Sequence, residues 1–164
     1  MYKIKLLILL LISTILLSCS SNHQTNQNHN AFSVDYIDGG FDGLQLKNYL
    51  ISYLDSYKMY DPQSTLSIKG NIAHSSSVYI TNINNTSDRN KITSQLNIQI
   101  YHNDQKCLLY SFNQSSSQFF IISSSKNYLS NNSAEAKIKN DNLNYLIKKF
   151  INEIKTISLS CPDA

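Results

Sequence analysis

The chain has 164 residues, of which 41% are hydrophobic and only 15% are charged, and its formal net charge at pH 7 is +3. Globular proteins typically carry about 25% charged residues, so asparagine, serine and glutamine must supply much of the polar surface here. The small net charge excludes the strongly basic surface that grips a phosphate backbone, and we expect no nucleic-acid partner.

The N-terminal segment is expected to be a targeting sequence and not part of the folded domain. Lys3 and Lys5 precede an apolar run from Leu6 to Leu17, which is shorter than the ~20 residues that a membrane-spanning helix needs. A basic start, a short apolar run and a small residue at the end are typical of a secretory signal peptide. We therefore predict a signal peptide over residues 1–18.

The end of this segment carries a more specific pattern. Residues 16–19 read Leu-Leu-Ser-Cys, which resembles the lipobox of bacterial lipoproteins. That resemblance implies cleavage before Cys19, acylation of its thiol and anchoring of the chain in a membrane, where more than one acyl chain gives stable binding. Ser20 and Ser21 follow the cysteine where an inner-membrane lipoprotein would carry aspartate, which implies the outer membrane.

Removing the signal peptide leaves 146 residues, the size of one domain. It also removes two of the 14 lysine and arginine residues, which leaves 12 against 11 acids and a net charge of +1. Ser20 to Asn30 holds no large apolar residue and cannot bury a core. We therefore predict a lipidated tether over residues 19–30 and a single α+β domain over residues 31–164.

The domain begins with a short strand and a helix. Phe32, Val34 and Tyr36 alternate with polar residues up to the Gly39-Gly40 turn, which predicts a strand. Asp42 is the expected N-cap of the helix that follows. This helix is expected to end before Asp61-Pro62, because the residue before a proline disfavours helical geometry. The apolar stripe of this helix recurs at three- and four-residue steps. It comprises Leu46, Tyr49, Leu50, Tyr53, Leu54 and Tyr57.

Three stretches of alternating polarity follow. The first runs from Leu66 to Ile80 as one long or interrupted strand, and a polar loop is expected over Thr81 to Asn90. The second strand has an apolar face and a polar face, and a tight turn at residues 102–105 leads to a returning strand. After a serine-rich patch, an apolar run at residues 119–122 is expected to extend the sheet. The apolar face of the second strand comprises Ile92, Leu96, Ile98 and Ile100.

A long amphipathic helix is expected at the C-terminal end. Ser133 is its predicted cap, with Glu135 in the first turn, where the helix dipole favours a negative charge. Its apolar stripe comprises Leu143, Leu146, Ile147, Phe150, Ile151, Ile154 and Ile157. These patterns predict an α+β two-layer sandwich, with two helices packed on one face of a mostly antiparallel four-stranded sheet.

The sequence holds no pattern typical of catalysis. No glycine-rich phosphate loop, Gly-x-Ser-x-Gly elbow or Cys-x-x-Cys pair is present, so we expect a protein that is not an enzyme and that binds no metal or cofactor. Cys107 and Cys161 are either free or joined by one disulfide, since nothing in the sequence fixes their separation.

The whole mature chain resembles the LptE family of lipopolysaccharide-assembly lipoproteins. The resemblance rests on the lipobox, the tether, the helix near Gly43-Leu44-Gln45, the three strands with a long polar hairpin, the aromatic patch and the Ser-Ala-Glu-Ala segment at residues 133–136. It implies a non-enzymatic protein that plugs an LptD-like outer-membrane β-barrel and contacts lipopolysaccharide.

Cations near the predicted loops are the expected contacts to lipopolysaccharide phosphates. Arg89 and Lys91 flank the hairpin loop and Lys126 precedes the last helix, and arginine and lysine suit phosphate as a two-pronged donor and a point charge. Solvated loop cations are the alternative for each of the three.

Two other classes of function remain open from the sequence. The first is a periplasmic scaffold or activator lipoprotein that acts on cell-wall enzymes, although a tether of this length spans only about 40 Å. The second is a small-molecule-binding lipoprotein, which would need an apolar pocket with a few convergent polar groups.

Overall fold

A computed structural model describes residues 30–80, 88–121 and 128–161. The element order is β1 (Ser33–Asp38), α2 (Gly40–Ser56), β2 (Leu66–Ile80), β3 (Asp88–His102), β4 (Cys107–Ile121) and α3 (Tyr128–Ile154). The predicted signal peptide, Cys19 and most of the tether lie outside the described residues.

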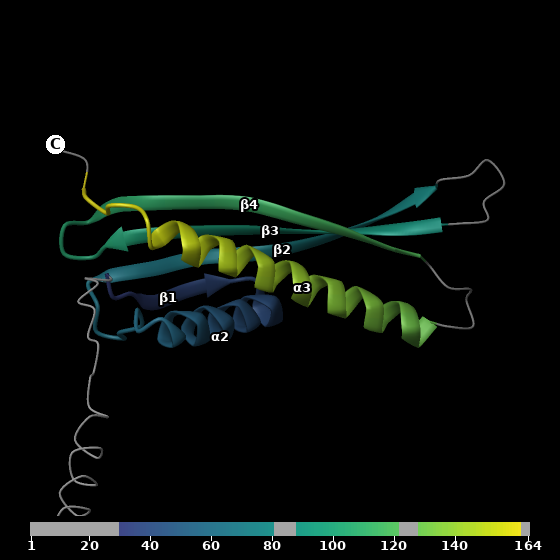
Figure 1. Ribbon diagram of the computed structural model, residues 1–164, viewed down its shortest axis with the longest axis horizontal. Coiled ribbons are helices and arrows are strands. Elements are labelled where there is room, and N and C mark those ends of the chain that lie inside the picture. The colour runs from purple at the N-terminus through teal and green to yellow at the C-terminus, as the bar shows by residue number, and fades with distance from the viewer. Residues whose placement is uncertain (1–29, 81–87, 122–127, 162–164) are drawn as a thin grey trace, which may run out of the picture.

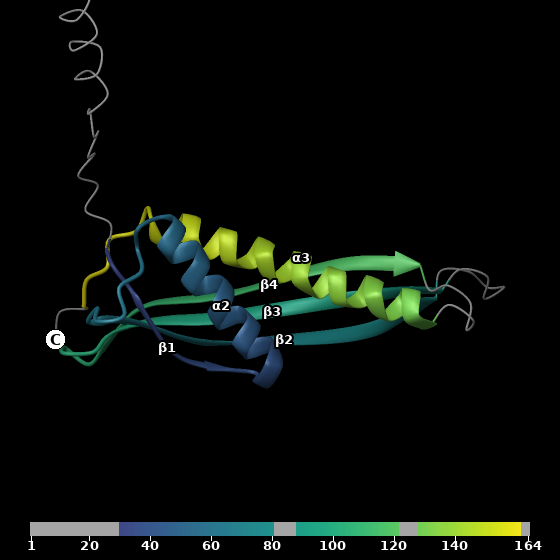
Figure 2. The ribbon, with the colours of Figure 1, turned by 90° about the horizontal axis from the view of Figure 1, so that it is seen from below.

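The strands form one sheet in the order β1-β2-β3-β4. β1 pairs with β2 in parallel, whereas the β2–β3 and β3–β4 pairs are antiparallel. Both helices pack on the same face of this sheet (Figures 1 and 2). This architecture confirms the predicted α+β sandwich.

The sheet is long because β2, β3 and β4 each have 15 residues, against 6 in β1. We call the end at the β3–β4 turn, residues 103–106, the proximal end, and the opposite end the distal end. β2 pairs with β3 without a break from Leu66 opposite His102 to Ile80 opposite Asp88. The first stretch is therefore one continuous strand and not an interrupted one.

The strands include polar residues at the end of the predicted loop and in the serine-rich patch. The expected loop over residues 81–90 is shorter than predicted, because β3 already begins at Asp88. The serine-rich patch of β4 also stays in the sheet, with Ser115 opposite Gln95 and Ser117 opposite Thr93. Backbone pairing to β3 holds these residues extended, although their side chains carry no apolar alternation.

The first helix begins two residues before its predicted cap. Gly39 is the N-cap, with a φ of 118°, and it has no side chain that could supply a capping hydrogen bond. Asp42 is therefore not the N-cap; it lies in the first turn, where the helix dipole still favours its charge. The helix start lies close to β1, since a Cβ on Gly43 would approach the Asp38 carbonyl oxygen to 2.5 Å.

The second helix also starts earlier than predicted. α3 begins at Tyr128, so Ser133 lies inside the helix and is not its cap. Ile157 lies beyond the helix end at Ile154, where it is partly buried against the core. The serine and glutamate that resemble a start signal simply occupy the solvated first turns of a longer helix.

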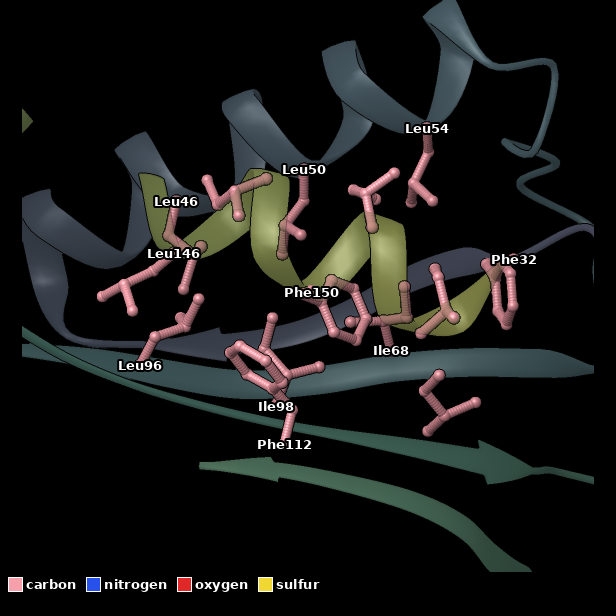
Figure 3. Close-up of a cluster of buried hydrophobic side chains, with 14 of the residues drawn as sticks. Phe32, Leu46, Leu50, Leu54, Ile68, Leu96, Ile98, Phe112, Leu146 and Phe150 are labelled. Carbon is pink, nitrogen blue, oxygen red and sulfur yellow. The ribbon is translucent and has the colours of Figure 1, made fainter. Parts of the chain in front are cut away.

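The apolar stripes of both helices meet the inner face of the sheet in its proximal half (Figure 3). The rings of Phe112 and Phe150 pack edge to face, with centroids 5.5 Å apart. The buried cluster confirms the apolar face of β3 and both predicted stripes except at Tyr57, which lies past the end of α2 and is 43% exposed. Its members include Phe32, Leu46, Leu50, Leu54, Ile68, Leu96, Ile98, Ile100, Leu143, Leu146, Ile147 and Ile151.

Candidate functional site

Arg89 and Lys91 lie at the distal end of the sheet, on β3 and not in a loop. They are two residues apart, so their side chains project from the same face. Every described buried residue of β3 lies at an even position, so odd positions face away from the helices. The two cations therefore lie on the outer face of the sheet.

Aromatic and aliphatic side chains surround these cations. Arg89 is paired with Tyr79 on β2 and Ile121 on β4, and Lys91 is paired with Phe119 on β4. The Lys91 Nζ lies 5.9 Å from the centre of the Phe119 ring, and the Tyr79 and Phe119 rings meet edge to face at 5.9 Å. We call these five residues the distal patch.

The apolar members of the distal patch are unusually open to solvent. Tyr79 is 56% exposed, Phe119 51% and Ile121 67%. A patch that combines exposed rings with two cations suits an amphipathic anion, because the cations can bind phosphate while the rings contact apolar or sugar surface.

Sequence reasoning identified the cations but not Tyr79 or Ile121 as their neighbours. The neighbours follow from the pairing register of three strands, and only the odd-position alternation across residues 79, 89 and 91 hints at a shared face. Lys126, the third predicted cation, lies outside the described residues, as does Cys19.

The rest of the outer face is mostly polar and uncharged, and the charge of Lys69, opposite Gln99, is paired with the Asp35 carboxylate at 3.4 Å. Neighbouring strands are linked by short side-chain hydrogen bonds, such as Thr93 to Ser117 at 2.8 Å and the Gln95 amide to Asn113 at 3.2 Å. We call this surface, between the distal patch and the proximal end, the neutral outer face. Its members are Asn71, Ala73, Ser75, Ser77, Thr93, Gln95, Asn97, Gln99, Ser111, Asn113, Ser115 and Ser117.

A buried polar network lies on the opposite, inner face beneath α3. Asn142 is fully buried; its amide oxygen accepts hydrogen bonds from Ser116 and Gln118 at 3.0 Å, and its amide nitrogen donates to Ser94 at 3.2 Å. Ser94 in turn lies 2.7 Å from His74 Nδ1. The network attaches the middle of α3 to the sheet by hydrogen bonds instead of apolar packing.

Ser94, His74 and Asp42 resemble a nucleophile, a base and an acid, but their geometry does not serve catalysis. Ser94 is 0% exposed, so no substrate can reach its hydroxyl. His74 Nε2 lies 4.0 Å from the Asp42 carboxylate, which is beyond hydrogen-bond distance. Burial lowers the pKa of His74 below its ordinary value, and the Asp42 charge opposes that shift only in part. The three residues form a structural link.

Cys107 and Cys161 are joined in a disulfide, with their Cα atoms 6.0 Å apart. The sequence had left open whether these two cysteines are free or bonded, and the structure shows them bonded. It ties the segment after α3 to the first residue of β4 at the proximal end. Structural disulfides persist in oxidising compartments such as the periplasm.

Two features of the described residues bear on metal and small-ligand binding. They contain no cluster of three or more histidine, cysteine or acidic side chains able to hold a metal ion. A hollow of about 390 Å³ between α2 and α3 is lined by Phe41 and Ala136 together with polar side chains, including Asp42, Glu135 and Lys139. The Glu135 and Lys139 side chains are paired with each other at 2.8 Å. None of the helices within the described ranges is long and apolar enough to cross a membrane.

No family model and no curated protein matches this sequence. Among solved structures, the minor lipoprotein from Acinetobacter baumannii is similar at 12% identity and a TM-score of 0.61, over 83% of this chain and 98% of that one. Rare lipoprotein B from Shewanella oneidensis is similar at 8% identity and a TM-score of 0.58, over 76% of this chain and 95% of that one. The chain therefore shares its fold with two bacterial lipoproteins.

Proposed function

We propose that this chain is an outer-membrane lipoprotein that plugs a β-barrel lipopolysaccharide translocon, helps the barrel assemble and assists insertion of lipopolysaccharide at the cell surface. The observation that carries the proposal is the neutral outer face. The fold shared with two bacterial lipoproteins and the lipobox that ends in Cys19 support the same assignment. In this role the protein acts by binding, without catalysis.

A plug must fill a polar lumen without burying unpaired charge. The interior of a large outer-membrane barrel is polar, and burial of an unpaired charge costs several kcal/mol. Serine, threonine, asparagine and glutamine can donate and accept hydrogen bonds at no such cost. The neutral outer face offers these groups across three strands of 15 residues.

The distal patch is the proposed contact to lipopolysaccharide. Arg89 and Lys91 bind phosphate groups of the ligand, and Phe119 and Tyr79 lie against its uncharged parts. The Lys91 ammonium lies 5.9 Å from the Phe119 ring centre, so one ligand could contact both the cation and the ring.

The barrel contact is tested by placing charge on the neutral outer face. Ser75→Glu combined with Gln95→Glu adds two acids at exposed positions of β2 and β3. We expect the intact lipoprotein to lose co-purification with a large barrel from detergent extract, because the new charges would be buried unpaired. The control is Asn152→Glu on the exposed side of α3, which should co-purify normally.

Two results would contradict the barrel contact. One is full retention of the barrel by the double variant. The other is a wild-type protein that purifies with a peptidoglycan synthase and no barrel, which would favour a scaffold for cell-wall enzymes. Depletion of the protein should in addition leave the barrel misassembled.

The lipopolysaccharide contact is tested by Arg89→Glu with Lys91→Glu. We expect affinity for purified lipopolysaccharide to fall at least about tenfold, the effect of losing about 1.4 kcal/mol of charge-assisted binding. Barrel association should survive. Lys137→Glu with Lys148→Glu, at exposed positions of α3, is the control with the same charge change, and equal weakening by both pairs would reduce the effect to net charge alone.

A further inference from the structure

The two edges of the sheet differ in how they are protected. β1 forms one edge and is only 6 residues long, with Asp35 and Asp38 among them. The Lys47 ammonium of α2 donates to the Asp35 carbonyl, and Lys69 pairs with the Asp35 carboxylate at 3.4 Å. Short length, charge and an occupied carbonyl are devices that prevent a further strand from pairing.

β4 forms the other edge and is neither short nor charged, although its register against β3 shifts once, between Leu108 and Tyr110. It runs for 15 residues, Cys107–Ile121, without a charged residue or a proline. It is the last strand in the sheet order, and the segment after α3 is tied to it at Cys107. Its outward residues Ser111, Asn113, Ser115 and Ser117 are all exposed. Such an edge presents unpaired backbone donors and acceptors to another strand.

We propose that β4 pairs with β4 of a second copy of this chain, antiparallel and about a two-fold axis perpendicular to the sheet. This isologous pairing extends the sheet through both copies and leaves the helices of both on the same face. Because the strand is uncharged, its self-pairing sets no like charges opposite each other. Serine, asparagine and glutamine side chains meet their counterparts and can form hydrogen bonds.

The distribution of charge selects the antiparallel orientation. Arg89 and Lys91 lie opposite Ile121 and Phe119 at the distal end of β4. A parallel pair would bring the cationic ends of the two copies together. The antiparallel pair separates them by about the length of the strand, roughly 50 Å at ~3.3 Å per residue, far beyond the screening length of about 8 Å.

This inference concerns the free backbone edge of β4 in copies that do not occupy a barrel, since a copy that plugs the lumen has the barrel wall around that edge. Where the chain is anchored through Cys19, confinement to a membrane raises the local concentration of copies and favours the pair.

The first test is a cysteine scan of β4 in the intact lipoprotein in its own membrane. Ser111→Cys, Asn113→Cys, Ser115→Cys and Ser117→Cys are oxidised one at a time and resolved on non-reducing gels. In an antiparallel pair the Cβ atoms of opposed residues lie about 4.5–5.5 Å apart, near the geometry of a disulfide. We expect a dimer band that is strongest at the position nearest the axis.

The matched control is Gln95→Cys, which lies on β3 directly opposite Ser115 and has the same outward direction without access to the edge. It should give no dimer band. Absence of a dimer band from all four β4 positions would overturn the proposal. Cross-linking to a different protein would overturn it as well, because another partner would then occupy the edge.

A second variant tests the pair without cross-linking. Ser115→Lys places two cations near the axis, and we expect the dimer dissociation constant, measured by sedimentation of the detergent-solubilised lipoprotein, to rise at least about tenfold. Gln95→Lys should leave it unchanged. A wild-type protein that sediments as a monomer at all concentrations, or equal effects of both lysines, contradicts the proposal.

Discussion

The proximal and distal halves of the sheet are built from different side chains on the same three strands. In the proximal half the inner face of β3 carries Leu96, Ile98 and Ile100, all fully buried under both helices. In the distal half the corresponding positions of the three strands include His74, Ser94 and Ser116. They lie mainly beneath α3 (Figure 2), and only the first turn of α2 reaches them, with Asp42 4.0 Å from His74. One half is a hydrophobic core and the other is a polar arm.

The proximal half of the sheet therefore stabilises the fold, whereas the distal half presents side chains for binding. The proximal half holds the apolar area whose burial drives folding, and the distal half gains little from that source. What the distal half offers instead is the distal patch, with Tyr79, Arg89 and Lys91 held at the far end of paired strands. Long β-pairing is a rigid way to present such groups away from the core.

The largest expected effect is in the proximal core. Phe150→Ala removes a buried ring that packs on Phe112 at 5.5 Å, and we expect the free energy of unfolding, measured in urea, to fall by about 3–5 kcal/mol. Tyr145→Ala on the same helix is the control, because Tyr145 is 58% exposed and its loss should cost within about 0.5 kcal/mol. Similar losses from both would refute the placement of the core.

Loss of the disulfide should have the second largest effect on stability. Cys107→Ser combined with Cys161→Ser opens a link across 54 residues, and we expect a loss of about 2–4 kcal/mol from the greater freedom of the unfolded chain. Reduction of the wild-type protein should lower the stability by the same amount. If stability is insensitive to both changes, the proximal end does not depend on its tie to the C-terminal segment.

A smaller loss is expected from the polar network that replaces the core in the distal half. Asn142→Ala leaves the buried Ser94 without its amide donor, and a buried polar group left unpaired costs about 1–3 kcal/mol. The control is Asn152→Ala, at an exposed position of the same helix. Should the two variants unfold alike, water must already satisfy the network, and the distal half is an open surface.

The proximal half could be predicted from the sequence because its residues follow simple periods. Leu46, Leu50 and Leu54 recur at helical spacing and Ile98 and Ile100 alternate with polar residues, so burial could be assigned residue by residue. The order of elements and the two-layer arrangement followed from these stripes.

The distal half could not be predicted in the same way, since polar side chains such as His74, Ser94 and Ser116 interrupt the apolar alternation of its inner face. Ser115 and Ser117 resemble loop residues by composition, and only their partners on β3 make them strand. The same lack of contrast hid the neighbours of Arg89, because Tyr79 and Ile121 reach it through register and not through any local pattern. The start of α3 was missed for a related reason, since its solvated first turns carry no apolar stripe.

The smallest expected effect is a pH dependence at His74. Burial lowers the pKa of its imidazole below the ordinary value of 6.5, so below pH 6.5 the unfolded chain binds a proton that the folded chain does not. Stability is therefore full above pH 6.5 and falls as the pH drops from 6.5 towards the folded pKa. One proton limits the slope to about 1.4 kcal/mol per pH unit.

Urea unfolding of the wild type and of His74→Gln between pH 5 and 8 measures this contribution. We expect the wild-type stability curve to be steeper than that of the variant below pH 6.5 and parallel to it above, where the imidazole is neutral in both states. Parallel curves throughout would mean that His74 is as hydrated in the folded protein as in the unfolded chain. Water would then reach Ser94, and the side chains beneath α3 in the distal half would form a solvated surface and not a buried hydrogen-bond network.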